Sequence, residues 1–265
     1  MINFKPIDEL TILSRCEEWL RYDGQPVQMR HGFSLYLRPN CEYSRRRYVY
    51  RIAEAVEIDF LDQKLKKLKD KNPLEASFFD VGANIGYYSK MMANNYKSAT
   101  IYSFEPDQIT FEILKKNTSS ENNVKIYNFG LGENTDFYNM YIDPKDSGDN
   151  TLLPIEGRDF IKIQIKTFDE FIEINKIKNV KFIKIDIQGY EVQFLIGAKK
   201  TINKYRPIIM IEVMDKYIKI RNSISTLAVE KNYSINVVNG TKIVVITPIE
   251  FLNFQGDVNI FLMPN

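Results

Sequence analysis

Residues 77–88 are the stretch of this chain that most constrains its fold. An apolar run that includes Phe78, Phe79 and Val81 predicts a buried strand, and the small-residue turn Gly82-Ala83-Asn84-Ile85-Gly86 follows it directly. A helical pattern begins immediately after the turn. A strand, a glycine-rich turn and a helix in this order present backbone N–H groups and the positive end of a helix dipole to a nucleotide-like ligand. The stretch therefore predicts an α/β fold with a ligand site at the carboxyl end of this strand.

Strands and helices alternate after residue 77, which predicts a mainly parallel sheet with helices on both faces. We expect strands at 77–81, 100–105, 124–129, 180–187 and 207–213, and helices at 86–95, 107–118, 190–203 and 215–231. Two further strands, 137–141 and 161–166, are predicted around a polar loop. The last three predicted strands, 234–238, 242–247 and 259–263, have short connections. They must pair antiparallel, because a parallel crossover takes roughly a dozen residues or more.

The residues before this sheet are predicted to form a separate N-terminal α/β segment. We expect a helix at 8–22, one or two strands within 26–39 and a long helix at about 48–69. The break at Lys71-Asn72-Pro73 predicts a boundary, with an accessory segment at 1–72 and the main domain at 73–265. The accessory segment carries no recognisable motif. We expect it to shape the pocket of the second substrate together with the insertion at 137–166.

Charge and cysteine content exclude several classes of function. The 265 residues include 36 basic and 34 acidic ones, and this balance gives no general attraction to nucleic acid or to an anionic membrane. Cys16 and Cys41 make neither a disulfide framework nor a metal cluster, and the single histidine, His31, argues against His-dependent sites. We find no signal-peptide pattern and no apolar run near the ~20 residues that a bilayer span needs. A cytoplasmic protein without nucleic-acid partners is therefore expected.

Two carboxylates stand at informative places near the predicted strand ends. Glu105 lies about 20 residues beyond the turn, where a carboxylate can accept hydrogen bonds from both hydroxyls of a ribose. Asp80 comes directly before the turn, where it would repel a pyrophosphate but would suit an ammonium or sulfonium group. S-adenosylmethionine carries both of these cations and a ribose, so it is the predicted cofactor. Alternatively, Asp80 orders the turn through backbone N–H groups.

Lys184 lies inside an apolar run that predicts a central buried strand. The two-residue period of a strand places Lys184 and Asp186 on the same face, about 7 Å apart. A buried lysine is rare unless it is paired, so the two residues form either a structural ion pair or a catalytic pair. As a catalytic pair they would orient or deprotonate an acceptor hydroxyl, with a desolvated lysine or the carboxylate as the base.

Two glutamates complete the set of candidate catalytic residues. Glu191 falls in the first turn of the next predicted helix, where it acts in catalysis or simply interacts with the helix N-terminus. Glu212 ends the following predicted strand. With Asp186 and Asp215 it offers oxygen ligands that suit Mg²⁺, so a divalent cation is possible, although we predict no metal site.

Four motifs, taken in order, resemble FkbM-type S-adenosylmethionine-dependent methyltransferases. They are Asp80-Val-Gly82-Ala-Asn84-Ile-Gly86-Tyr-Tyr-Ser, Phe104-Glu105-Pro106, Lys184-Ile-Asp186-Ile-Gln-Gly189-Tyr-Glu191 and Arg206-Pro207-Ile-Ile-Met-Ile-Glu212. The resemblance runs from about residue 77 to the C-terminus. One departure is Gln188, where the family more often has Glu, and this leaves the role of that side chain open. The resemblance implies a Rossmann-like class I sheet of seven strands with an antiparallel last strand. It also implies O-methylation, commonly of a sugar hydroxyl in a glycan or a glycosylated metabolite.

The resemblance also assigns roles to residues by position. Cofactor binding would fall to Asp80, Gly82, Ala83, Asn84 and Gly86 at the methionine part, to Glu105 and Pro106 at the ribose, and to Gly130 and Leu131 at the adenine. Asp186 would face the reacting methyl group or the acceptor, and the other candidate catalytic residues are Lys184, Glu191 and Glu212.

Other functions remain open at this point. A short-chain nicotinamide-dependent oxidoreductase would need a Tyr-x-x-x-Lys helix, and Tyr141 to Lys145 has Pro144 between them, which disfavours a helix. A nucleic-acid amino-methyltransferase would need an Asn/Asp-Pro-Pro-aromatic motif where this chain has Asp186-Ile-Gln-Gly. A methyltransferase acting on a non-sugar hydroxyl, and an inactive glycan-binding relative, are the remaining alternatives. The sequence leaves the oligomeric state open.

Overall fold

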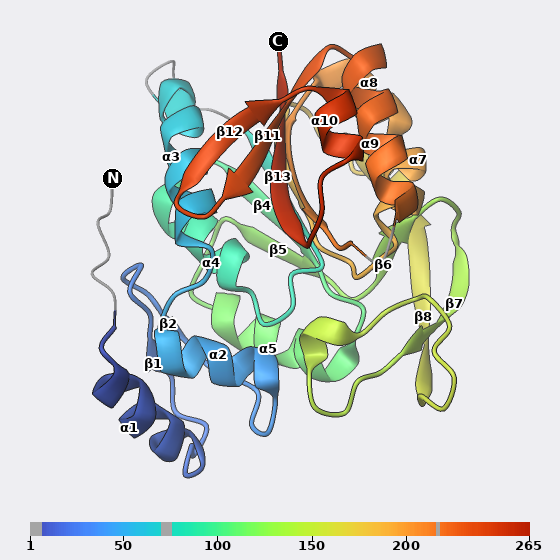
Figure 1. Ribbon diagram of the computed structural model, residues 1–265. Coiled ribbons are helices and arrows are strands. Elements are labelled where there is room, and N and C mark those ends of the chain that lie inside the picture. The colour runs from blue at the N-terminus through green and yellow to red at the C-terminus, as the bar shows by residue number, and fades with distance from the viewer. Residues whose placement is uncertain (1–6, 70–75, 216–217) are drawn as a thin grey trace.

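The computed structural model describes residues 7–69, 76–215 and 218–265 (Figure 1). The predicted boundary at residues 71–73 lies outside the described residues. An eight-stranded sheet crosses the molecule in the order β12-β11-β13-β10-β9-β3-β4-β5. No helix in the described ranges is long and apolar enough to cross a membrane.

The middle and one edge of the sheet consist of five parallel strands, as predicted. They are β3 (Ser77–Val81), β4 (Thr100–Phe104), β5 (Val124–Tyr127), β9 (Val180–Ile185) and β10 (Ile208–Val213). The last strand, β13 (Val258–Pro264), lies antiparallel between β10 and β11 (Tyr233–Asn239). The class I methyltransferase fold is therefore confirmed, and β12 (Lys242–Ile246), paired antiparallel with β11, adds an eighth strand at the edge.

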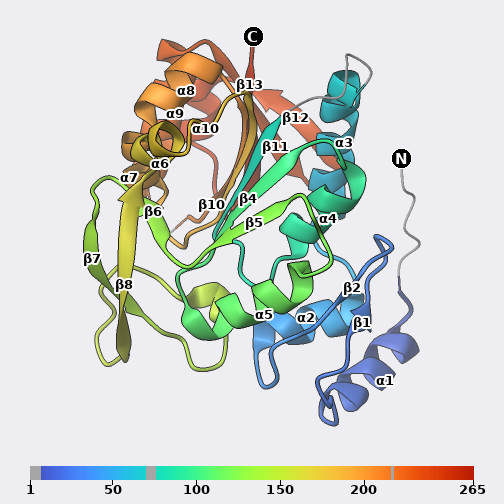
Figure 2. The same ribbon diagram turned by 180° about the vertical axis from the view of Figure 1, so that it is seen from behind.

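Helices cover both faces of the sheet (Figure 1, Figure 2). One face carries α6 (Phe168–Ile174), α7 (Glu191–Gly197), α8 (Lys199–Tyr205), α9 (Ile218–Glu230) and α10 (Pro248–Leu252). The other carries α3 (Ala55–Lys69), α4 (Tyr87–Asn95) and α5 (Gln108–Thr118). The sequence analysis missed α6 and α10, although α10 begins with a capping box of Thr247 and Glu250.

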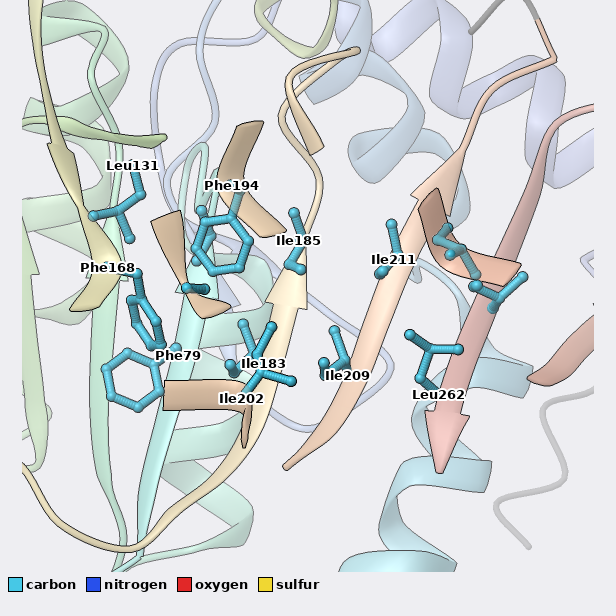
Figure 3. Packing of buried hydrophobic residues seen from close by; sticks show 14 of the residues in the cluster. Phe79, Leu131, Phe168, Ile183, Ile185, Phe194, Ile202, Ile209, Ile211 and Leu262 are labelled. Atoms are coloured by element: carbon cyan, nitrogen blue, oxygen red, sulfur yellow. The ribbon is translucent and has the colours of Figure 1, made fainter. Parts of the chain in front are cut away.

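The alternation of side chains along each strand divides the core into two layers. Figure 3 shows strand residues such as Phe79, Ile183 and Ile209 packed with Phe168 and Phe194 of the helices on one face. The neighbouring strand positions point to the opposite face, where Phe78, Phe182 and Met210 pack with α3 and α4. Asp80 and Lys184 lie two residues beyond Phe78 and Phe182, so they belong to this second face.

A small side sheet contains the predicted insertion. Its order is β6-β8-β7, with β6 (Gly130–Gly132) parallel to β8 (Phe160–Thr167) and β7 (Asp136–Tyr141) antiparallel to it. The strands expected at 137–141 and 161–166 are thus confirmed. The polar loop between them contains the short 3₁₀ helix η1 (Ser147–Asp149), which contacts the N-terminal segment.

The N-terminal segment differs from the prediction at one important place. It contains α1 (Glu9–Trp19), β1 (Val27–Gln28), β2 (Ser34–Leu35), α2 (Glu42–Tyr50) and α3. The continuous helix predicted at about 48–69 is wrong, because α2 ends at Tyr50 and α3 begins at Ala55. Between them Arg51 and Glu54 have positive φ angles of 58° and 45°, which a right-handed helix cannot contain. The break brings Glu54 to the candidate site.

Candidate active site

A cavity of about 440 Å³ opens at the carboxyl ends of the parallel strands. Its walls come from the turn after β3, from the ends of β4, β9 and β10, from the side sheet and from the N-terminal segment. Ligands bind at this edge in open α/β sheets. Among the predicted site residues, those on the cavity wall are Gly82, Asn84, Glu105, Pro106, Gly130, Leu131, Asp186 and Glu212.

The turn after β3 has a conformation that its glycine makes possible. Gly82 has a φ of 78°, and a Cβ atom there would lie 1.9 Å from the backbone oxygen of Asp186. Any side chain at this position would push the ends of β3 and β9 apart. Asn84 also has a positive φ, 49°, and its Oδ1 accepts a hydrogen bond of 2.8 Å from the Ile85 N–H. The predicted cofactor residues Ala83 and Gly86 do not line the cavity, so their contribution is to the shape of the turn.

Glu105 lines the cavity and also forms a hydrogen bond with the backbone of the turn. Its Oε2 accepts a hydrogen bond of 2.8 Å from the Asn84 N–H, and its Oε1 accepts one of 2.9 Å from the Asp107 N–H. A carboxylate has roughly four lone-pair sites, so two hydroxyl donors can still bind the same oxygens. Burial raises the pKa of Glu105 to about 8. The side chain therefore orders the turn and also offers acceptors to a ligand in the cavity.

An apolar wall lies beside Glu105. Gly130 and Leu131 of β6 line the cavity together with Ile163 and Ile165 of β8. A Cβ atom at Gly130 would lie 2.5 Å from Cδ1 of Ile165, so glycine lets β6 approach the β8 side chains closely. An apolar surface and a carboxyl group that can accept hydrogen bonds are the features that an adenosine would require of its site.

Asp186, Gln188 and Glu212 form a hydrogen-bonded group in the cavity wall. The Gln188 side-chain amide donates to Asp186 Oδ1 over 3.0 Å and to Glu212 Oε2 over 2.9 Å. Burial works to raise the pKa of Asp186, but Lys184 and the hydrogen bonds from Glu212 and Gln188 hold it below its usual value. The charge of Asp186 and burial raise the pKa of Glu212. The pair thus holds one proton, on Glu212, and Asp186 stays ionised.

Lys184 lies behind this group and is shared by two carboxylates. Its Nζ is 3.2 Å from Asp186 Oδ2 and 3.8 Å from Asp80 Oδ1. Asp80 is the partner of Lys184 in the register between β3 and β9. Burial would lower the pKa of Lys184, but the charges of Asp186, Asp80 and Glu54 outweigh it and raise the pKa. A neutral lysine base, one of the two options above, is therefore not supported, and Lys184 acts as a fixed cation.

Asp80 and Glu191 have structural partners and do not line the cavity. Asp80 is fully buried and accepts a hydrogen bond of 2.6 Å from the Ser89 hydroxyl, and burial raises its pKa. Glu191 Oε1 accepts hydrogen bonds from the backbone N–H groups of Ile187 and Gly189, over 3.2 Å and 3.1 Å. Glu191 thereby closes the loop that carries Asp186, which favours the structural interpretation of this residue.

The sequence analysis missed the residues that the N-terminal segment and η1 add to the wall. Tyr43 and Arg47 of α2 and Glu54 from the helix break line the cavity, as do Asp149, Asn150 and Thr151. For Glu54 no signal existed, because no glycine or proline marks the break.

The oxygen ligands considered for a divalent cation are not gathered at one point. Asp215 Oδ1 lies 3.0 Å from Arg221 Nη2, and Asp215 does not line the cavity with Asp186 and Glu212. In the part of the chain that the structure describes, no group of three or more His, Cys, Asp or Glu residues is arranged to hold a metal ion.

Comparisons with known proteins agree with this geometry. The family model described as the methyltransferase FkbM domain matches residues 80–224. Methyltransferase 1 from Beauveria bassiana is 24% identical over 199 residues, which cover 65% of this chain and 75% of that protein. The hexuronic acid methyltransferase AglP from Haloferax volcanii is 24% identical over 135 residues, which cover 50% of this chain and 54% of AglP. This chain therefore spans about half of the length of AglP.

One similar solved structure is described as an FkbM methyltransferase. The crystal structure of methyltransferase FkbM from Methylobacillus flagellatus is 19% identical, with a TM-score of 0.47. The similarity covers 80% of this chain and 56% of that one.

Proposed function

The chain belongs to the FkbM family of methyltransferases, and we propose that it transfers the methyl group of S-adenosylmethionine to a hydroxyl group of a sugar. The observation that carries the proposal is the cavity at the carboxyl edge of the sheet. Its wall contains Glu105, whose carboxyl oxygens can accept hydrogen bonds from hydroxyl groups, an apolar surface, and Asp186, which neighbouring groups hold in the ionised form. The groups that a nucleoside and a proton transfer would need thus line one cavity.

The residues of the cavity fit S-adenosylmethionine. In this proposal Glu105, with Pro106, binds the ribose hydroxyls, and the wall of Gly130 and Leu131 holds the adenine. Gly82 and Asn84 lie along the methionine part. Asp80 does not line the cavity, so it contributes by holding Lys184, which in turn holds Asp186, and Ala83 and Gly86 act through the shape of the turn.

Asp186 is the group that we assign to the acceptor hydroxyl. S-adenosylmethionine supplies an electrophilic methyl group on a sulfonium. The ionised Asp186 accepts a hydrogen bond from the hydroxyl, aligns its oxygen for in-line attack, and takes the proton as the new C–O bond forms and the C–S bond breaks. Gln188 fixes the Asp186 carboxylate through its Oδ1, and Lys184 keeps it ionised through its Oδ2. Glu212, which holds the proton of the pair, is a hydrogen-bond donor beside the acceptor.

A sugar acceptor is supported by the polar character of the remaining wall. Asp149, Asn150, Thr151 and Asp257 line the same cavity as Asp186. These side chains offer the mixed donors and acceptors that a ligand with several hydroxyls requires. The relative AglP acts on a hexuronic acid, as its name states, and this is consistent with a carbohydrate acceptor.

Two measurements test the proposal in sequence. Calorimetry should show that S-adenosylmethionine binds, whereas NAD and NADP do not, and the absence of any heat with S-adenosylmethionine at millimolar concentration would contradict the cofactor assignment. Incubation with a methyl-labelled donor and a panel of glycosides, uronic acids and non-sugar alcohols should then transfer label to a sugar oxygen, located by mass spectrometry. Label found only on the non-sugar alcohols would refute the sugar assignment and leave the methyltransferase reaction standing.

A further inference from the structure

Arg47 is a cation on the cavity wall. Its guanidinium carbon lies 3.6 Å from the centre of the Tyr43 ring, and its Nε is buried without a hydrogen-bond partner. By contrast, Arg45 and Arg46 on the same helix pair with Glu42 and Asp146, over 2.6 Å and 3.0 Å. Within residues 7–69, 76–215 and 218–265 no carboxylate forms an ion pair with Arg47. A guanidinium that stacks on an aromatic ring and has a buried Nε–H without a partner is well prepared to bind a carboxylate.

Glu54 is a carboxyl group on the same wall, held there by a strained backbone. Burial raises the pKa of Glu54, whereas the nearby charges of Lys184 and Arg47 favour its ionised form. It has a φ of 45°, a conformation that costs about 1 kcal/mol or more in a residue other than glycine. The Tyr88 hydroxyl donates a hydrogen bond to Glu54 Oε2. The neighbouring Ala53 N–H donates to the Tyr87 hydroxyl over 3.0 Å. These two tyrosines begin α4, so they fix Glu54 against the helix that follows the cofactor turn.

Arg47 and Glu54 interact electrostatically but form no direct ion pair with each other. Arg47 and Glu54 each influence the other electrostatically, and both sense the charge of Asp186. Yet no ion pair joins them in the described residues. A guanidinium and a carboxyl group that line one cavity without pairing with each other complement the α-carboxylate and the α-ammonium of an amino acid.

The position of the pair points to the cofactor. The ribose carboxylate Glu105 binds the backbone of Asn84 at one side of the turn. At the other side, η1 covers the turn, because the Ser147 hydroxyl donates to Asn84 Oδ1 over 3.3 Å. Gly82, Asp186, Arg47 and Glu54 line the same cavity, and both Arg47 and Glu54 interact electrostatically with Asp186. A methionine chain that runs past Gly82 towards Asp186 would therefore end near Arg47 and Glu54.

We infer that Arg47 and Glu54 clamp the amino-acid end of S-adenosylmethionine, with Arg47 on the α-carboxylate and Glu54 on the α-ammonium. The inference rests on the proposed function, because it requires this cofactor in the cavity. It gives the N-terminal segment a direct part in cofactor binding, since both side chains come from residues before the main domain. Without this segment, the turn after β3 would hold the nucleoside but not the zwitterion.

Ligands that lack one or both charges test the clamp by calorimetry. S-adenosylmethionine carries both charges, decarboxylated S-adenosylmethionine carries only the ammonium, and 5′-methylthioadenosine carries neither. Arg47→Met should weaken the binding of S-adenosylmethionine about 10- to 100-fold, which is the loss expected for a hydrogen bond between charged groups. The affinities for the other two ligands should stay within about threefold of the wild-type values. Glu54→Gln should weaken the binding of both ligands that carry the ammonium and leave the affinity for methylthioadenosine unchanged. Arg45→Met, with the same charge change on the same helix but away from the cavity, should change none of them.

Each result separates the clamp from the cofactor assignment. If the wild-type protein binds none of the three ligands, the proposed function fails. If it binds S-adenosylmethionine and Arg47→Met binds it equally well, the clamp is wrong and the cofactor assignment stands. If Arg47→Met weakens the binding of methylthioadenosine as much as that of S-adenosylmethionine, Arg47 has a structural role and the clamp is also wrong. If Arg47→Met does not fold, the conservative variant Arg47→Lys serves for the same comparison.

Discussion

Replacing Lys184 with methionine tests whether the buried charges behind the site are as tightly coupled as the geometry indicates. Lys184 Nζ lies 3.2 Å from Asp186 and 3.8 Å from Asp80. At an effective dielectric constant of about 20, these distances correspond to gross attractions of about 5 and about 4 kcal/mol. Desolvation of the lysine offsets much of this. Removing one partner of a buried ion pair still destabilises a protein by about 3–5 kcal/mol, because the other charge is left buried. We expect a loss of this size at pH 8.

The loss of stability in Lys184→Met should be larger at high pH than at low pH. Burial already raises the pKa of Asp80, and without Lys184 this pKa must rise further. Folded Lys184→Met then holds a proton on Asp80, whereas the unfolded chain releases that proton above a pH of about 4. Because the folded state binds more protons, the free energy of unfolding falls as pH rises, by up to about 1.4 kcal/mol per unit. The deficit relative to wild type should therefore shrink towards pH 5.

Urea denaturation followed by circular dichroism at pH 5, 6.5 and 8 measures this effect. Lys181→Met is the matched control, because Lys181 is on the same strand but only partly buried, and it should cost less than about 1 kcal/mol at each pH. The double variant Asp80→Asn/Lys184→Met should lose the pH dependence and recover part of the stability. A loss for Lys184→Met that is the same at all three pH values would refute the reasoning.

Three further predictions concern single residues. Glu105→Ala should weaken S-adenosylmethionine about 10- to 100-fold in calorimetry. Since burial raises the pKa of Glu105 to about 8, wild-type affinity should fall as pH drops through this value, and a flat profile would remove Glu105 from the ribose site. Asp186→Asn should abolish methyl transfer while cofactor affinity stays within about threefold, and near-normal turnover would exclude Asp186 as the base. Gly82→Ala should cost more than about 2 kcal/mol in urea denaturation, because its Cβ would lie 1.9 Å from the Asp186 oxygen. Gly157→Ala, with a similar φ of 77° and no atom within 4 Å, should cost about 1 kcal/mol, and equal losses would show that the contact is unimportant.

Local sequence patterns predicted the sheet and the cofactor end of the site because both depend on neighbouring residues. The strand before Gly82 and the turn that follows it are adjacent in the chain, and the two-residue strand period already placed Lys184 and Asp186 on one face. Asp80 as the second partner of Lys184 could not be predicted, because it depends on the register between β3 and β9. That register is set by how the whole sheet assembles, and 100 or so residues separate the two strands in the chain.

The N-terminal part of the site was hidden for a different physical reason. Apolar and charged residues continue at helical spacing through 48–69, so the pattern predicts one helix. The interruption at Arg51 and Glu54 exists because tertiary contacts hold it, among them the hydrogen bonds from Tyr87 and Tyr88 of α4. A conformation that only distant partners stabilise leaves no mark in the local sequence.

Gln188, the one departure from the family motif, has a role that follows from the charges around it. A carboxylate at this position would stand about 3 Å from both Asp186 and Glu212, as the amide nitrogen does at 3.0 Å and 2.9 Å. Three carboxyl groups at this spacing could not all ionise, and the extra charge would raise the pKa of Asp186, which the proposed reaction needs in its ionised form. The neutral amide instead donates to both neighbours and keeps the single proton of the pair on Glu212. In this chain, Lys184 through one carboxylate oxygen and Gln188 through the other therefore hold Asp186 as the ionised proton acceptor at the carboxyl ends of the strands.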